Sequence, residues 1–404
     1  MKEPRTAGLF FWVMSAVASA MRTKPVVKNC KASRDINRCG GVRFFSARVN
    51  VNWTRLKRTQ EDNMHRPESG YPWSPHTPFQ ALSLSGGGFR GLFTAQVLAE
   101  IEEAAGVPVG RRFDLVCGTS IGALIATAIA FEVPMRRVVD VFATHGAAVF
   151  PPDQRPSSLM GWAREFWRHR HSPRYAMAPL REVMAALIDP QATLADALHP
   201  VAIATVDART GTPRTFRSPH HADFVSDGGI RVMDAAAGAA AAPTFFEMAS
   251  VNGSMYVDAG LFATAPDLIA LSEIAHRFGV GAEATRMLSV GTTTASYGLP
   301  AQLGCNMGYL DWFDDQRLVC LTMAAQQQFA DQFLKDQLHD RYYRLDHAPT
   351  PDEQTRLGSG IDVSTQAAYQ TLVAVAQERA RAALASDLQV FLQHKPQLKV
   401  MRDM

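Results

Sequence analysis

The chain has 404 residues, enough for one large domain or two, and its apolar content of 47% is ordinary for a soluble globular protein. Residues 1–63 hold thirteen Lys and Arg against four acidic residues, a net charge of +9, whereas the whole chain carries only +3. The excess of basic residues thus belongs to this N-terminal segment and does not predict nucleic-acid binding by the remainder of the chain. The five cysteines lack metal-ligand spacing, which predicts a reduced protein without a metal site. They are Cys30, Cys39, Cys117, Cys305 and Cys320.

Residues 1–78 differ in composition from the remainder and are expected to form a basic N-terminal extension, disordered or signal-like. Ala7–Met21 is an apolar run of 15 residues, too short to predict a membrane span. It is similar to a signal-peptide core, with Ala18–Ala20 as a cleavage motif. The alternative is that Met64 is the natural start, which the abrupt change of charge favours. In that interpretation a chain beginning at Met64 keeps its fold and activity.

Two strand–turn–helix units follow, each with a turn rich in glycine. In each unit a short β-prone run stops at glycines and is followed by a helix with apolar spacing. The first unit comprises Phe79–Leu84, Gly86–Gly88 and Leu92–Ala105, and the second comprises Phe113–Cys117, Gly118–Gly122 and Ala123–Phe131. This order predicts two neighbouring parallel strands with both turns at the same edge of a sheet.

The second turn has the pattern of a nucleophile elbow, because Ser120 lies two residues from both Gly118 and Gly122. In such an elbow the serine occupies a strained turn, and the helix that starts there favours negative charge on its oxygen. The hydroxyl needs a base, and its tetrahedral intermediate needs hydrogen-bond donors, which the amides of Gly86–Gly88 can supply. An elbow alone is a weak signal, but beside a glycine loop it predicts a serine hydrolase.

Other interpretations of these turns are open. Gly86–Gly91 also fits a dinucleotide-binding loop, which needs an acidic residue at the far end of the second strand. That end carries the serine elbow, and Asp114 lies at the start of the strand, so this interpretation is disfavoured. A further alternative is an elbow without chemistry in a degenerate homologue. His145, His169 and His171 belong to no motif and are expected to be surface or structural histidines.

The sequence up to residue 294 continues to alternate helices and strands. Helices are expected at Pro134–His145, Pro179–Leu187, Asp234–Ala242 and Pro266–Phe278, and strands at Pro200–Val206 and Arg286–Val290, with a hairpin over 205–216. This alternation predicts an α/β fold with three layers and a mostly parallel central sheet. Its sites are expected at the carboxyl ends of the strands.

A Pro-rich segment that becomes aromatic and basic interrupts this alternation. Its cations suit a lipid headgroup boundary or an anionic ligand, and its aromatic side chains could stack a base. The residues concerned are Arg164, Arg168, Arg170, Trp162 and Trp167. The alternative is a loop helix that packs its aromatic side chains on the core.

The chain after residue 300 contains no recognisable motif. Helices are expected at Asp315–Leu334 and Ser364–Leu392, with a strand at Asp340–Asp346 between them. We therefore expect a hydrolase domain over 79–300 and a helical C-terminal region over 301–404 that packs on it or caps it.

At its motifs the sequence resembles the patatin-like phospholipase family, over about residues 79–294. The matching stretches are Gly86–Gly91, Gly118–Gly122 and Asp258–Gly260. The resemblance implies a Ser/Asp dyad with Ser120 as the nucleophile and Asp258 as its base. It also implies an oxyanion hole formed by the amides of Gly86, Gly87 and Gly88, and supporting roles for Arg90, Gly91, Gly118, Gly122 and Gly260.

One position departs from the family pattern. The third motif is usually Asp-Gly-Gly or Asp-Gly-Ala, whereas this chain has Ala259 between Asp258 and Gly260. If the backbone there needed a positive φ, alanine would cost about 1 kcal/mol or more. The conformation of Ala259 is therefore a check on the placement of the base.

Within the family, the sequence resembles the bacterial antiphage phospholipases that cyclic GMP–AMP activates, in Phe79–Glu103, in Phe113–Gly122 and in the helical region after Gly291. The resemblance implies cleavage of acyl esters in membrane phospholipid, without a metal or other cofactor. It implies an enzyme that stays inactive until a partner nucleotidyltransferase makes a cyclic dinucleotide.

Such an enzyme would act in the cytoplasm at the inner membrane surface, would bind no nucleic acid, and is compatible with a homo-oligomer. Two alternatives stay open. One is a constitutive lipase or lysophospholipase, secreted behind residues 7–21. The other is a catalytically dead module that binds lipid or nucleotide.

Overall fold

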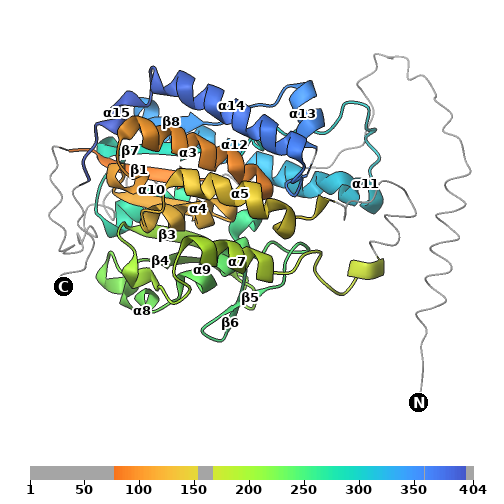
Figure 1. Ribbon diagram of the computed structural model, residues 1–404, viewed down its shortest axis with the longest axis horizontal. Coiled ribbons are helices and arrows are strands. Elements are labelled where there is room, and N and C mark those ends of the chain that lie inside the picture. The colour runs from red at the N-terminus through yellow and green to blue at the C-terminus, as the bar shows by residue number, and fades with distance from the viewer. Residues whose placement is uncertain (1–76, 153–166, 359, 397–404) are drawn as a thin grey trace, which may run out of the picture. The chain divides into compact units, whose positions relative to one another are not determined.

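The computed structural model describes residues 77–152, 167–358 and 360–396, and its centre is one eight-stranded sheet (Figure 1). The strand order is β5-β6-β3-β2-β1-β7-β8, and β4 also pairs with β3. The strands are β1 (Phe79–Leu84), β2 (Leu115–Thr119), β3 (Val201–Asp207), β4 (Pro213–Arg217), β5 (Ala249–Val251), β6 (Ser254–Asp258), β7 (Thr285–Val290) and β8 (Tyr342–Leu345).

The middle of the sheet is parallel, and its antiparallel pairs lie beside β3. Strands β3, β2, β1, β7 and β8 run parallel, whereas β4 and β6 pair antiparallel with β3, and β5 with β6. Strand β1 is buried throughout and sends Leu82 and Leu84 into one core and Phe79 and Ala81 into the other. A strand covered on both faces is expected in such a parallel sheet.

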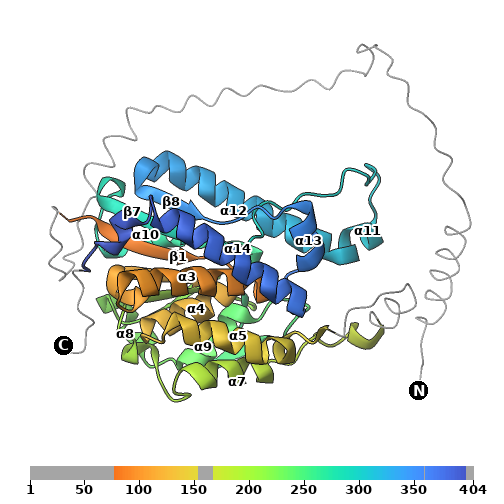
Figure 2. The same cartoon turned by 45° about the horizontal axis from the view of Figure 1, so that its top comes forward.

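Helices cover both faces of the sheet and make three layers (Figure 2). The larger core lies under α3 (Gly91–Ala105), α4 (Ile121–Ala130), α5 (Met135–Val149), α7 (Ala178–Leu187), α9 (Val232–Ala240) and α14 (Gln366–Leu384). The smaller core lies under α10 (Asp267–Arg277) and α12 (Arg317–Leu338). The apolar stripes of these helices bury both faces of the sheet.

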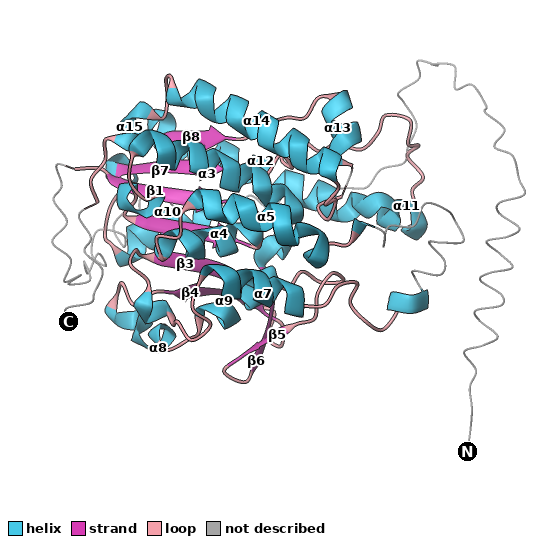
Figure 3. Ribbon diagram, viewed as in Figure 1, coloured by secondary structure: helices cyan, strands magenta, loops and turns pink. Residues whose placement is uncertain are grey.

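The chain beyond residue 300 belongs to the same sheet and the same layers. Strand β8 pairs in parallel with β7, with Leu345 opposite Val290, and α14 packs against α3. The shorter helices here are α11 (Tyr309–Phe313), α13 (Pro351–Leu357) and α15 (Gln389–Leu392), and α8 (Val225–Gly228) lies earlier in the chain. The C-terminal region is therefore mostly helical, as predicted, and the strand predicted at Asp340–Asp346 is β8, the last strand of the sheet (Figure 3).

Most elements lie where the sequence predicts them, and the α/β fold with a mostly parallel sheet is confirmed. The second strand begins at Leu115, two residues later than predicted, because the Asp114 side chain accepts a hydrogen bond from the Gln80 amide at 2.8 Å. The long helix expected at Ser364–Leu392 is divided into α14 and α15. The chain turns between them, and the Leu388 amide donates to the Ala383 carbonyl at 3.0 Å.

Several predictions concern residues outside the described ranges. These are the extension up to residue 76 with its apolar run 7–21, and also Cys30, Cys39, Trp162 and Arg164. Within the described ranges, no helix combines the length and the apolar character needed to cross a bilayer.

Candidate active site

Ser120 lies in the sharp turn between β2 and α4, with φ 54° and ψ −126°. A positive φ is uncommon for a residue other than glycine, and here it lifts the serine out of the strand at the start of a helix. The flanking glycines are required by close packing. A Cβ on Gly118 would overlap the Gly122 carbonyl oxygen, and a Cβ on Gly122 would overlap that of Leu84. The sequence pattern thus forms the elbow predicted for a nucleophile.

Asp258 is the last residue of β6 and lies beside this elbow. It pairs with Thr205 of β3, while Thr119 at the end of β2 pairs with the neighbouring Ala204. This register brings the two predicted catalytic residues together, and the Ser120 hydroxyl lies near enough to the Asp258 carboxylate to favour its charged form.

The environment of Asp258 makes it a stronger base than an exposed aspartate. The side chain is buried, and burial raises its pKa from 3.8 to about 6, although the Ser120 hydroxyl and the Gly260 amide favour the charged form. The Gly260 amide lies 2.7 Å from the Oδ1 atom. A base with a pKa close to neutrality can accept a proton and later return it.

Ala259 fits this turn without strain. It begins a 3₁₀ turn over Ala259–Leu261 and is not among the residues with a positive φ. The departure from the family's third motif therefore carries no backbone penalty at this position.

The glycine loop after β1 offers fewer free amides than the sequence suggests. The Gly86 amide donates to the Thr264 carbonyl at 2.8 Å, which corrects the expectation that all three loop amides are available to an oxyanion. Within the described residues, the amides of Gly87 and Gly88 donate to no other group. Gly88 has φ +57°, and a Cβ on Gly87 would overlap the Thr292 side chain, so this backbone conformation needs glycine.

Arg90 ties this loop to distant parts of the chain. The side chain is 5% exposed and donates to three carbonyl groups, those of Gly358, Gly360 and Thr293, at 2.6, 3.3 and 3.2 Å. A guanidinium group presents its donors in a fixed fork, which suits carbonyls that lie in different directions. Beside it, the Phe89 amide donates to the Ile361 carbonyl at 2.8 Å.

Comparison with known proteins agrees with this geometry. The family model described as patatin-like phospholipase matches residues 82–271, a span that includes both Ser120 and Asp258. A protein of Pseudomonas aeruginosa (strain BWHPSA011 / Pa011), named cGAMP-activated phospholipase, is 33% identical over 319 residues, 78% of this chain and 92% of its own length. The chain belongs to the patatin-like phospholipase family.

Two further relatives bear the same name, cGAMP-activated phospholipase. The protein of Vibrio cholerae serotype O1 is 35% identical, over 66% of this chain and 81% of its own length. The protein of Escherichia coli (strain TW11681) is 32% identical, over 76% of this chain and 90% of its own length. This patatin-like phospholipase, a serine acyl hydrolase, is thus related to enzymes named for activation by cGAMP.

The remaining glycines predicted to support the motifs allow close approaches. A Cβ on Gly91 would overlap the Ile121 side chain, where the first turns of α3 and α4 meet. A Cβ on Gly86 would lie 3.1 Å from the Cβ atom of Ser120. Gly260 supplies the amide that binds Asp258.

The histidines singled out in the sequence lie on other elements than the predicted catalytic pair of this patatin-like phospholipase. His145 and His171 are exposed, and His169 bonds through Nδ1 to the Pro173 carbonyl at 2.9 Å. In the aromatic and basic segment, the Arg170 guanidinium stacks on the exposed Trp167 ring at 4.9 Å.

A buried serine–histidine–glutamate chain escaped the sequence analysis. The Ser218 hydroxyl bonds to Nδ1 of His220 at 2.9 Å, and Nε2 of His220 lies 3.3 Å from Glu273. All three side chains are buried, and the Ser218 oxygen also accepts the Val201 amide at 2.9 Å. Because Val201 begins β3, this cluster lies at the edge of the sheet opposite the elbow, and its bonds mark it as structural.

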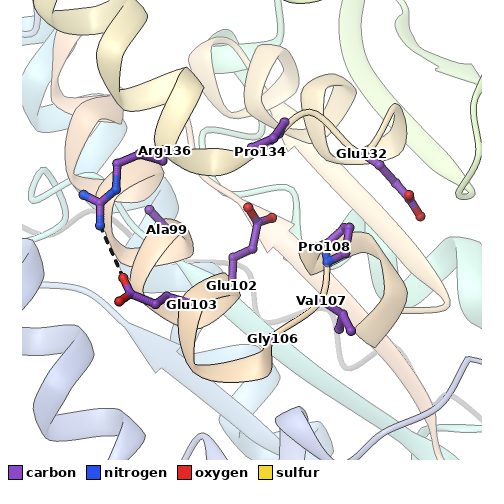
Figure 4. Close-up of a pocket in the computed structure, with 9 residues that line it drawn as sticks. All are labelled: Ala99, Glu102, Glu103, Gly106, Val107, Pro108, Glu132, Pro134 and Arg136. Atoms are coloured by element: carbon purple, nitrogen blue, oxygen red, sulfur yellow. Dashed lines mark hydrogen bonds and ion pairs between the residues drawn. The ribbon is translucent and has the colours of Figure 1, made fainter.

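The pocket shown in Figure 4 lies where α3 and α4 end, whereas Ser120 lies at the start of α4. Two of its carboxylates already have hydrogen-bond or ion-pair partners. Glu102 accepts the amides of Val109 and Met135 at 3.2 and 3.0 Å, and Glu132 pairs with Arg111 at 2.7 Å. Among the described residues, no group of three His, Cys, Asp or Glu side chains is arranged to hold a metal ion.

Proposed function

We propose that this patatin-like phospholipase cleaves acyl esters of membrane phospholipid with Ser120 as the nucleophile and Asp258 as the base. The observation that carries the proposal is that Ser120, strained at the start of α4, lies beside a buried carboxylate whose pKa is raised to about 6. A nucleophile beside a base of this strength needs no third catalytic side chain to be activated.

The reaction follows from these contacts in two steps. Asp258 takes the hydroxyl proton as the Ser120 oxygen attacks the ester carbonyl, and the amides of Gly87 and Gly88 bind the oxyanion. The intermediate then collapses, the ester C–O bond breaks, and Asp258 returns the proton to the departing alcohol oxygen. In the second step Asp258 removes a proton from water, and the water oxygen attacks the acyl carbon. The bond between this carbon and the Ser120 oxygen then breaks, Asp258 returns the proton to the Ser120 oxygen, and the fatty acid leaves.

The test compares wild type with Ser120→Ala and Asp258→Asn on a soluble chromogenic ester and on phospholipid vesicles. We expect both variants to lose activity by several orders of magnitude, because each removes one member of the dyad. A fluorophosphonate probe should label the wild type and not Ser120→Ala. Unchanged hydrolysis or labelling in Ser120→Ala would reject the dyad, and an unlabelled, inactive wild type would favour a binding module.

We further propose that a cyclic dinucleotide, made by a partner nucleotidyltransferase, activates the enzyme at the inner membrane surface during antiphage defence. The support is the name of three relatives that cover most of this chain, cGAMP-activated phospholipase. An enzyme that degrades the membrane of its own cell must also be held inactive until it is needed. The test is vesicle hydrolysis by the purified protein with and without a panel of cyclic dinucleotides. Equal, high activity in every condition would leave a constitutive lipase.

A further inference from the structure

The base and the glycine loop of the candidate site are joined by a segment that follows the base. This segment comprises residues 258–264. Its Gly260 amide donates to the Asp258 carboxylate, and its Thr264 carbonyl accepts the Gly86 amide. The Thr119 hydroxyl, next to the nucleophile, donates to its Ala263 carbonyl at 2.7 Å. The conformation of this one segment therefore influences the base, the nucleophile and the glycine loop together.

Helix α12 of the C-terminal region holds this segment through the side chain of Gln326. Its Oε1 atom accepts the Thr264 amide at 3.0 Å and the Thr264 hydroxyl at 3.1 Å. Its Nε2 atom donates to the carbonyls of Gly260 and Leu261 at 3.2 and 3.3 Å. A carboxamide has two donors and an acceptor oxygen with two lone pairs, so these four bonds use its full capacity.

The four bonds are specific to a glutamine at this position. The Thr264 amide can only donate, so it fixes the oxygen of the carboxamide on that side and directs the nitrogen to the two carbonyls. Glutamate would keep the acceptor and lose both donors, and methionine would fill the same space and lose all four bonds. The neighbouring glutamines face elsewhere: Gln327 bonds to Thr294 and Arg344, and Gln328 bonds to the Ala295 carbonyl.

We infer that Gln326 is a positioning residue for the hydrolytic reaction, which holds residues 258–264 so that Asp258 and the glycine loop keep their places relative to Ser120. Gln326 itself does not contact Asp258 or Gly86. It binds Gly260, whose amide donates to Asp258, and Thr264, whose carbonyl accepts the Gly86 amide. The helix that bears it lies outside residues 82–271, the span matched by the family model. The C-terminal region thereby takes part in turnover.

The experiment compares Gln326→Met and Gln326→Glu with the wild type, and uses Gln332→Met as the matched control, because Gln332 is exposed on the same helix. The full-length proteins are assayed on a soluble chromogenic ester as a function of pH, with and without cGAMP. We expect Gln326→Met to lower kcat roughly 10- to 100-fold with little change in KM, since small misplacements of catalytic groups have effects of this size. Gln326→Glu should show a smaller loss, and Gln332→Met none.

A purely structural role of Gln326 would leave the pH profile of kcat/KM unchanged, so this profile is a separate test. The Gly260 amide favours the charged form of Asp258, so a looser Gly260 should shift the acidic limb of kcat/KM to higher pH in Gln326→Met. If Gln326→Met does not fold, as judged by thermal melting, the inference is decided by Gln326→Glu alone. Wild-type kcat and an unshifted acidic limb in the folded variant would overturn it.

This inference rests on the proposed dyad, and the two can fail separately. The rate of fluorophosphonate labelling is measured in every variant and in Ser120→Ala. Labelling that persists in Ser120→Ala would reject the dyad itself. Labelling that depends on Ser120 but proceeds at the wild-type rate in Gln326→Met and Gln326→Glu would retain the dyad and reject the role of Gln326.

Discussion

At the scale of single residues, the acidity of Asp258 connects the structure most directly with activity. The carboxyl group is buried, and burial raises its pKa to about 6. Only the ionised form can accept the Ser120 proton, so we expect kcat/KM on a soluble ester to rise with pH and to reach half its maximum near pH 6. An acidic limb near pH 4, the range of an exposed aspartate, would show that Asp258 is solvated or is not the base.

Arg90 is the second residue whose geometry makes a prediction. Its guanidinium group donates to the carbonyls of Thr293, Gly358 and Gly360, and a single lysine ammonium group cannot donate to all three. We expect Arg90→Lys to lower kcat on a soluble ester about tenfold and to lower the free energy of unfolding by about 1–2 kcal/mol, because buried carbonyls lose their donors. Full turnover in Arg90→Lys would show that the fork is not required to anchor the glycine loop.

At the scale of elements, the elbow depends on close contact between two strand ends. A Cβ on Gly122 would overlap the Leu84 and Ser85 carbonyl oxygens, just before the glycine loop. Since backbone atoms must move to admit it, we expect Gly122→Ala to lower the free energy of unfolding by about 1–3 kcal/mol and to abolish activity. The control is Gly229→Ala, where a Cβ meets no atom within 4 Å. Equal activity and denaturation midpoints for the two variants would contradict the packing argument.

At the scale of the whole molecule, the region after residue 300 completes the hydrolase. Strand β8 covers the edge of β7, and the Tyr342 hydroxyl donates to the buried Asp267 carboxylate at 2.8 Å. Arg344 of the same strand donates to Ser85 at 3.1 Å and to Gln327 at 2.9 Å. Removing this region would expose an edge strand and leave Asp267 buried with fewer partners.

We therefore predict that a chain ending at residue 300 does not fold to an active enzyme. Circular dichroism should show no cooperative melting, and a fluorophosphonate probe should not label Ser120. The full chain, expressed in parallel, is the control. A cooperative, labelled fragment would show that the boundary expected at residue 300 separates two independent units.

The sequence by itself determined the local elements and the elbow that bears Ser120. The 3.6-residue apolar periods give most helices within a few residues, and the spacing of Gly118, Ser120 and Gly122 identifies the elbow, because both depend on residues close together in the chain. It also indicated Asp258, but only through the family motif. Nothing near Asp258 in the sequence predicts its burial, and therefore its pKa.

Only the tertiary structure decided which groups meet across long separations. The Gly86 amide donates to the Thr264 carbonyl 178 residues away, so it is not available to the oxyanion hole that three glycines suggested. Three consecutive glutamines on α12 look alike in the sequence, yet only Gln326 reaches the segment after the base. Successive side chains on a helix point about 100° apart, so the partner of each is set by the element packed against that side of the helix, which no local pattern encodes.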